Sequence, residues 1–132
     1  MWDSSGCMIC GRGNQDGLQL EFVPEGEDGA VARGRIKDLF EGFAGLAHGG
    51  AIAAILDDAM WWAVLYAQGA RTLTAELTVR FQQPVPVGQL FVVRARVVQH
   101  RRRLSRAEAV LTDEDGSVVL ARAEGAFLVP PE

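Results

Sequence analysis

A long apolar segment in the middle of the chain constrains the fold more than any other feature. It runs from Gly45 to Ala67 with the sequence GLAHGGAIAAILDDAMWWAVLYA, and between Gly49 and Ala67 its only charged residues are Asp57 and Asp58. A helix that is apolar on every side is a buried helix. Carboxylates in such a helix lose hydration at a large free-energy cost, and a chemical role is one reason to keep them. The segment therefore predicts a buried central helix that carries a functional acid.

The same segment is nearly long enough to cross a membrane, but two features argue against a span. Each aspartate costs about 2.5–3.5 kcal/mol at the centre of a bilayer on insertion scales. The amino-terminal sequence, MWDSSGCMICG, lacks the basic start and the apolar run of a signal peptide. We therefore expect a soluble, cytoplasmic protein with no membrane partner.

Size and charge narrow the class of protein further. A chain of 132 residues with 48% hydrophobic residues predicts one globular domain, residues 1–132, in which residues 1–17 form an amino-terminal loop. The net charge of −4 offers no basic surface for nucleic acid. Two cysteines, Cys7 and Cys10, are too few for a disulfide scaffold.

Strands are predicted on both sides of the helix. Alternating apolar residues and the turn residues between them give strands at Leu18–Val23, Ala30–Ile36, Thr72–Phe81, Leu90–Val98, Leu104–Thr112 and Val118–Val129, with the helix at about Gly50–Gln68. Within the clearest strand, Thr74 is expected on the face opposite to Leu77 and Phe81. One helix supplies too few crossovers for a parallel sheet. The predicted fold is therefore α+β, with a curled antiparallel sheet wrapped around one long central helix.

Three motifs resemble a known family. GLAHGGAIAAILDDAMWWA and TAELTVRFQQPVPVG resemble the hotdog-fold acyl-CoA thioesterases of the phenylacetate-pathway type, and CMICGRGNQDGLQLEF resembles the amino-terminal signature of one branch. The resemblance extends from about Cys7 to Val129. It implies a hotdog fold, a homodimer or homotetramer, and hydrolysis of acyl-CoA to a carboxylic acid and free CoA, with no cofactor or metal.

The resemblance also implies the catalytic groups. The family's catalytic acid falls on Asp57 and not on Asp58. Its oxyanion donor falls on the backbone N–H of Gly49, and the hydroxyl that holds the attacking water in some relatives falls on Thr74. Some relatives carry an asparagine six residues before the histidine, where this chain has Gly42. That role is therefore absent here or is taken by another group.

Helix geometry decides whether Gly49 and Asp57 can belong to one site. A helix N-terminal N–H can polarise a thioester carbonyl, and a carboxylate can activate water or attack directly. Asp57 lies eight residues after Gly49, about 12 Å along the axis at 1.5 Å per residue, whereas reacting groups approach to about 3–3.5 Å. Either the two motifs are unrelated, or the acid comes from a second subunit. A two-fold dimer with its helices side by side gives two equivalent sites, so the family interpretation requires a homodimer or a dimer of dimers.

Neighbouring residues have a structural interpretation beside a functional one. We interpret His48 as a helix cap that also lines the substrate site together with Gly50. For Asp58 we favour a carboxylate bonded to backbone or sheet residues at the interface, close to the substrate. Trp61 is expected in the core, in the interface or in the wall of an acyl tunnel. No further ligand at a usable spacing accompanies His48 and Asp57, so no metal site is expected there.

Arg101, Arg102 and Arg103 form a basic turn between two predicted strands. The turn is either simply solvated or a contact point for the phosphates of CoA, and the pattern leaves both open. Arg80 is a candidate for the same phosphate contact.

Cys7 and Cys10 form a single CxxC motif. A zinc site requires four ligands and no second pair follows, so a metal site would need two pairs to meet across a dimer. A redox pair would lack a thioredoxin-like context. Free thiols in a structured loop are the preferred interpretation.

Two other functions stay open. A hotdog hydratase acting on enoyl-CoA usually pairs an aspartate with a histidine a few residues later, and no histidine follows Asp57 before His100. A non-catalytic acyl-CoA binding protein would act as a passive carrier. Release of free thiol from acyl-CoA separates these functions from a thioesterase.

Overall fold

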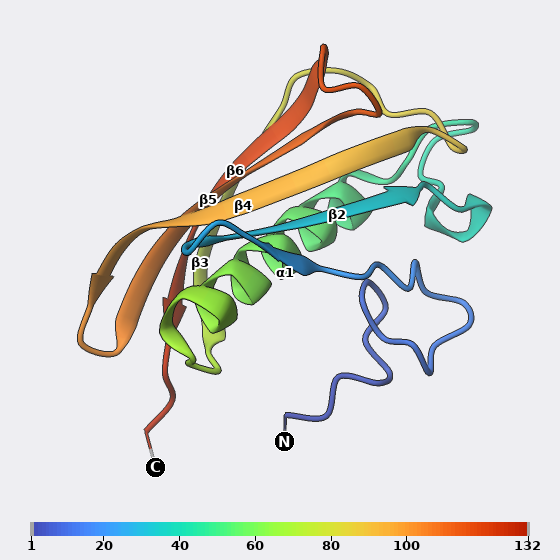
Figure 1. The fold of residues 1–132 in the computed structure, drawn as a ribbon. Coiled ribbons are helices and arrows are strands. Elements are labelled where there is room, and N and C mark those ends of the chain that lie inside the picture. Colours follow the sequence, from blue (N-terminus) through green and yellow to red (C-terminus); the bar gives the residue numbers. More distant parts are fainter. Residues whose placement is uncertain (1, 132) are drawn as a thin grey trace.

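The computed structural model describes residues 2–131, in which one α-helix lies against a six-stranded sheet (Figure 1). In chain order the elements are β1 (Val23–Glu25), β2 (Gly29–Arg35), the 3₁₀ helix η1 (Asp38–Phe40), α1 (Gly49–Gln68), β3 (Leu73–Phe81), β4 (Leu90–Arg101), β5 (Leu104–Asp113) and β6 (Val119–Leu128).

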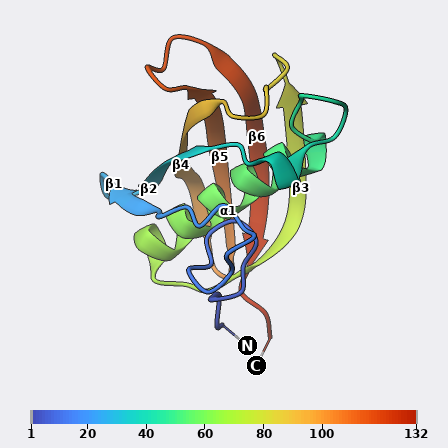
Figure 2. The same cartoon turned by 90° about the vertical axis from the view of Figure 1, so that its right-hand side faces the viewer.

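All strand pairs of this sheet are antiparallel, and the spatial order is β1-β2-β4-β5-β6-β3. β3 therefore lies at one edge, paired with β6 on one side only. The sheet curls around α1, and the amino-terminal loop lies on the opposite side of the helix (Figures 1 and 2). This arrangement confirms the predicted fold class of a curled antiparallel sheet around one long helix.

The local sequence determines both ends of α1. His48 has extended backbone angles, φ −64° and ψ 135°, and its ring Nδ1 accepts a hydrogen bond from the Gly50 N–H at 2.8 Å. Gly69 has a φ of 65°, which favours glycine, and its N–H donates to the Leu65 carbonyl at 2.8 Å. The cap predicted for His48 is confirmed, and the helix begins one residue before its expected start.

The two sides of α1 have different surroundings. Side chains facing the sheet, including Ile52, Ile55, Leu56 and Met60, are at most 2% exposed. Residues that lie next to the edge strand β3 or under the amino-terminal loop are only half-buried, at the pairs 53–54, 57–58, 61–62 and 65–66. By length and composition α1 is also apolar enough to cross a membrane, a property shared by core helices of folded domains. One copy of the chain thus leaves a partly covered stripe, contrary to the prediction of burial on every side.

The predicted strand at Leu18–Val23 is wrong. The N–H groups of Leu18 and Leu20 donate to the carbonyls of Met8 and Ile9 at 3.0 and 2.8 Å, so residues 18–22 pair with the amino-terminal loop. Only Val23, the first residue of β1, belongs to the sheet. Its alternating apolar residues are nevertheless buried. The pattern therefore reports burial correctly but does not identify the hydrogen-bonding partner.

A β-bulge in β3 changes the face of the strand on which Thr74 lies. Thr74 and Glu76 pair with consecutive residues of β6, so Ala75 is an extra residue. As a result Thr74 faces α1, on the same side as Phe81. The prediction of opposite faces for these two residues is wrong, because a bulge at an alanine leaves no mark in an alternating pattern.

Candidate active site

Asp57 and Thr74 form a hydrogen-bonded pair at the seam between α1 and β3. Thr74 Oγ1 donates to Asp57 Oδ1 at 2.7 Å, and the bulge at Ala75 is what turns the threonine towards the helix. Burial raises the pKa of Asp57 above its ordinary value, and the Thr74 hydroxyl partly lowers it by stabilising the charged form. An oriented carboxylate with a raised pKa is suited to accept a proton from water.

The second predicted catalytic group, the Gly49 N–H, lies at the first position of α1. A helix leaves its first N–H groups without an internal partner, and no residue in the described range 2–131 accepts a hydrogen bond from this one. A hollow of about 250 Å3 adjoins it, with Gly49, Ile52 and Phe81 among its lining residues. An unpaired N–H at the positive end of a helix dipole, beside a hollow, is suited to hold an oxyanion.

Backbone hydrogen bonds fix the turn that precedes α1. The Ala47 N–H donates to the Val85 carbonyl at 2.8 Å, and the Val87 N–H donates to the Gly45 carbonyl at 2.9 Å. The Pro-Val-Pro-Val-Gly segment therefore supports the turn from which the helix starts. This contact explains physically why that segment accompanies the His-Gly-Gly turn.

Two glycines lie against His48. A Cβ on Gly50 would be 3.0 Å from His48 Nδ1, and a Cβ on Gly42 would be 3.0 Å from the His48 Cα. Gly50 thus leaves room for the ring that caps the helix. Gly42 lies beside the turn, as the resemblance implies, but a side chain there would require the neighbouring backbone to shift.

One subunit does not bring Gly49 and Asp57 together. Both lie on the side of α1 that faces β3, because Asp57 contacts Thr74 and a Cβ on Gly49 would be 3.5 Å from the Phe81 ring. Eight helical residues separate the two groups, which is about 12 Å along the axis. A site that uses both groups therefore needs a second copy of the chain.

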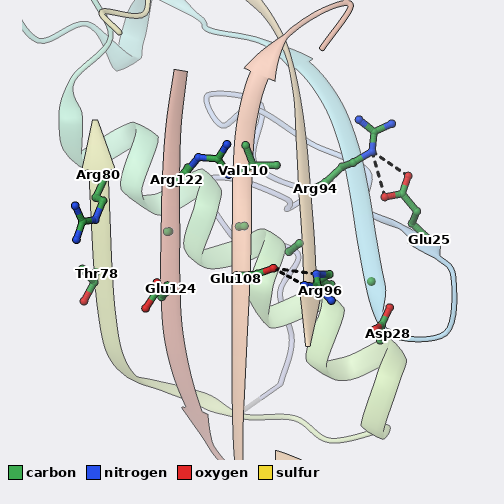
Figure 3. Close-up of a pocket in the computed structure, with 14 residues that line it drawn as sticks. Glu25, Asp28, Thr78, Arg80, Arg94, Arg96, Glu108, Val110, Arg122 and Glu124 are labelled. Atoms are coloured by element: carbon green, nitrogen blue, oxygen red, sulfur yellow. Dashed lines mark hydrogen bonds and ion pairs between the residues drawn. The ribbon is translucent and has the colours of Figure 1, made fainter. Parts of the chain in front are cut away.

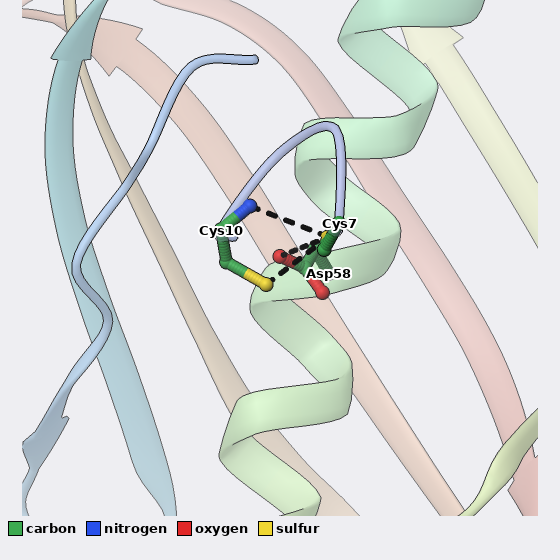
Figure 4. Close-up of side chains that lie close together, drawn as sticks. All are labelled: Cys7, Cys10 and Asp58. Atoms are coloured by element: carbon green, nitrogen blue, oxygen red, sulfur yellow. Dashed lines mark hydrogen bonds between the residues drawn. The ribbon is translucent and has the colours of Figure 1, made fainter. Parts of the chain in front are cut away.

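Asp58 has different neighbours although it is adjacent to Asp57. It lies against the amino-terminal loop, where Cys7 Sγ is 4.0 Å from Asp58 Oδ2 and 3.1 Å from Cys10 Sγ (Figure 4). Burial raises the pKa of Asp58 to about 7. The predicted backbone or sheet partner for Asp58 is wrong, and the contact was missed because the two motifs are 51 positions apart.

The two thiols differ in acidity. The Cys10 thiol donates to Cys7 Sγ, which lowers the pKa of Cys7 to about 5, and the same interaction raises the pKa of Cys10. The backbone N–H groups of Ile9 and Cys10 also donate to Cys7 Sγ, at 3.4 and 3.3 Å. Cys7 is therefore the thiol that is stabilised as a thiolate.

Trp61 and Trp62 follow the two aspartates by one helical turn and share their surroundings. Trp61 Nε1 donates to the Thr72 carbonyl at 2.7 Å, at the start of the strand that carries the partner of Asp57. Trp62 packs towards the amino-terminal segment, and its buried Nε1 has no partner among the described residues. Trp61 therefore lies beside the candidate site, whereas Trp62 belongs with Asp58.

The predicted arginines lie away from Asp57. Arg80 faces the opposite side of the sheet, in a broad hollow of about 680 Å3 that it shares with Arg94, Arg96 and Arg122 (Figure 3). The triplet Arg101, Arg102 and Arg103 forms the exposed end of the β4–β5 hairpin. One subunit brings neither group to the candidate site, so their contact with CoA stays a prediction.

A sequence profile of the thioesterase superfamily matches residues 44–120. The chain is 31% identical to acyl-coenzyme A thioesterase THEM5 of Mus musculus over 67% of its own length and 35% of that protein. It is 27% identical to acyl-coenzyme A thioesterase THEM4 of Xenopus laevis, over 87% of its own length and 53% of that protein. The chain thus spans about a third to a half of the length of these curated relatives.

Solved structures share the fold at low sequence identity. The zebrafish thioesterase superfamily member 2 has a TM-score of 0.80 at 17% identity, covering 96% of this chain and 94% of that one. The Escherichia coli PaaI protein of the phenylacetic acid degradation operon has a TM-score of 0.74 at 17% identity, covering 83% and 82%. A Streptococcus mutans protein bound to acetyl CoA has a TM-score of 0.76 at 18% identity, covering 86% and 90%.

Proposed function

Because this chain belongs to the thioesterase superfamily, we propose that it hydrolyses an acyl-CoA thioester to a carboxylic acid and free CoA. The observation that carries the proposal is that the Asp57–Thr74 pair and the unpaired Gly49 N–H lie on the same side of α1. Further support comes from the curated relatives named acyl-coenzyme A thioesterases and from the fold neighbour that binds acetyl CoA.

In the proposed reaction, water adds to the carbonyl carbon of the thioester. Asp57 takes the proton of the attacking water, and Thr74 holds the carboxylate in place. The partner subunit's Gly49 donates its N–H to the oxygen that gains negative charge. Collapse of the adduct breaks the carbon–sulfur bond, and the CoA thiolate receives the proton from Asp57. Direct attack by Asp57 on the carbonyl carbon is the other route that this arrangement allows.

The free edge of β3 is the surface that we propose joins two subunits. β3 is nine residues long and pairs on one side only. It exposes Leu73, Leu77 and Phe81, by 51%, 37% and 57%. A long apolar edge strand is a template for pairing with another chain. A two-fold axis at this edge lays the half-buried stripes of two α1 helices side by side, where Asp57 of each faces Gly49 of the other.

We expect Leu77→Lys to weaken the dimer by about 10–100-fold, because a lysine amine is costly to bury without a partner. Hydrolysis should fall in parallel at concentrations where the variant is monomeric. Sedimentation velocity measures the assembly, and circular dichroism checks the fold. Thr78→Lys is the matched control, since Thr78 lines the hollow on the other face of the same strand. A wild-type monomer with full activity would contradict the shared site.

Thr74→Val should move the acidic limb of the kcat/KM pH profile to higher pH. Removing the hydroxyl leaves the charged form of Asp57 less stabilised, so the pKa of Asp57 rises further above its ordinary value. The base is then available only at higher pH. We also expect kcat to fall about tenfold, the effect of losing one hydrogen bond to a charged group. Thr74→Ser keeps the hydroxyl and should keep the pH profile of the wild type. An unchanged acidic limb in Thr74→Val would show that Asp57 is not the group whose ionisation produces that limb.

The activity itself is tested by incubating the protein with a panel of acyl-CoAs and a reagent for free thiols. Steady thiol release supports the thioesterase. Binding of acyl-CoA without release identifies a passive carrier, and loss of enoyl absorbance without thiol release identifies a hydratase. Contact of Arg80 or Arg101–Arg103 with the CoA phosphates, and a cytoplasmic location, remain predictions.

A further inference from the structure

The CxxC motif lies outside the residues that match the thioesterase profile, and the proposed reaction does not use it. In the structure it meets a third residue with a ligand atom. Cys7 Sγ, Cys10 Sγ and a carboxylate oxygen of Asp58 all lie within 4.8 Å of one another (Figure 4). Two sulfurs from a loop and one oxygen from α1 thus converge on one point.

The loop is shaped before any ligand binds. Two backbone N–H groups, those of Ile9 and Cys10, already point at Cys7 Sγ. Gly11 closes the turn, because a Cβ there would lie 2.5 Å from the Cys7 nitrogen and 2.5 Å from the Ser5 carbonyl oxygen. Hydrogen bonds of this kind orient a sulfur and stabilise its thiolate form, which is the form that binds metal.

The two thiols and the carboxyl group of this cluster become negative when they lose their protons. No basic side chain forms an ion pair with Asp58 among the described residues. The buried indole N–H of Trp62 has no partner within residues 2–131, and it lies beside Asp58, whose carboxyl group it is placed to bind. A surface hollow of about 550 Å3 lined in part by Cys10 and Trp62 offers a route of entry.

From this geometry we propose that Cys7, Cys10 and Asp58 bind one divalent transition-metal ion, with Zn²⁺ as the best fit. Thiolates select soft or borderline metals, and zinc accepts sulfur together with carboxylate oxygen. Tetrahedral Zn–S bonds of about 2.3 Å place two sulfurs about 3.8 Å apart, so the 3.1 Å pair must open by less than an ångström. Solvent takes the fourth position. Both sulfurs bind as thiolates and Asp58 binds as a carboxylate, so binding releases whichever protons these three groups still hold.

The ion would fasten the amino-terminal loop to the middle of α1. The loop contributes two ligands and the helix one, so the metal crosslinks segments 51 positions apart in the chain. Because the unfolded chain holds no preformed site, binding stabilises the folded state. Asp57 lies on the neighbouring stripe of the helix and takes no part in coordination.

The test is a titration of the reduced, chelator-treated full chain with Co²⁺, followed by displacement with Zn²⁺. We expect thiolate-to-cobalt charge-transfer absorption that saturates at one ion per chain, and a higher Tm with Zn²⁺. The double variant Cys7→Ser/Cys10→Ser should lose the absorption, and Asp58→Asn should bind at least about tenfold more weakly. Asp16→Asn removes a carboxylate from the same loop and should bind as the wild type does.

Three results would overturn the site: no charge-transfer absorption, binding unaffected by Asp58→Asn, or a Cys7–Cys10 disulfide that forms readily and excludes the metal. The inference stands apart from the proposed hydrolysis. Asp57→Asn should bind Co²⁺ as the wild type does even if it is inactive, so failure of one proposal is distinguishable from failure of the other.

Discussion

Replacing Asp57 with asparagine is expected to lower kcat for acyl-CoA hydrolysis by about 10³-fold. Asparagine has nearly the same shape, and its Oδ1 can still accept the Thr74 hydrogen bond that the carboxylate accepts at 2.7 Å. It cannot take a proton or attack a carbonyl, so the loss reports chemistry and not folding. Free-thiol release from acyl-CoA measures the rate, while circular dichroism and sedimentation velocity check that fold and assembly are retained.

Asp58→Asn is the matched control for this variant. It removes the same charge one residue further along α1, but from the side chain that faces Cys7 and Cys10. We expect it to lower kcat by less than about tenfold, because a residue that does not touch the reacting atoms supplies no proton transfer. Near-normal hydrolysis by Asp57→Asn would remove Asp57 from the mechanism, and a larger loss in Asp58→Asn would reverse the assignment.

Gly49→Pro is expected to lower kcat by about 10²–10³-fold, the usual effect of removing one oxyanion donor. Proline lacks the N–H but suits the first position of a helix. The residue before a proline must be extended, and His48 already has a ψ of 135°. The substitution therefore deletes the donor and leaves α1 in place. Gly49→Ala keeps the N–H and should retain most activity, since its Cβ would make an ordinary contact with Phe81 at 3.5 Å.

Mixing the two inactive variants distinguishes a shared site from a site within one chain. A heterodimer of Asp57→Asn with Gly49→Pro has one site with both changes and one site with neither. Random exchange of subunits makes about half of the dimers mixed, so about a quarter of the wild-type activity should return. If each chain held its own complete site, every site would carry a change and mixing would restore nothing.

Local sequence patterns predict most of the fold. The apolar segment and its flanking His48 and Gly69 give a helix that agrees with α1 to within one residue at its start. Five of the expected strands are found, because the alternation of apolar residues and the turn residues that end a strand are both local features of the sequence. The segment at Leu18–Val23 fails because its partner is the loop around Met8, and a pattern within one segment does not say what it pairs with.

The candidate site was only partly predictable for the same reason. Neighbouring residues on a helix point about 100° apart, so Asp57 and Asp58 must face different surroundings. Which surroundings they face depends on where β3 and the amino-terminal loop lie. Thr74 is 17 positions from Asp57 and Cys7 is 51 positions from Asp58, so no local pattern brings these residues together. The roles assigned to Asp57 and Thr74 came from family resemblance, and strict alternation alone would have turned the threonine hydroxyl away.

Ala75 makes the register of β3 with β6 matter for the candidate site. Thr74 and Phe81 are seven positions apart, so a strand without a bulge would place them on opposite faces of the sheet. A redesign that regularised the ladder by pairing Ala75 with β6 would keep every side chain of the strand. It would nevertheless turn Thr74 away from Asp57, because a slip of one position exchanges the two faces. Such a change would leave the composition of β3 unaltered and still remove the hydrogen bond that orients Asp57.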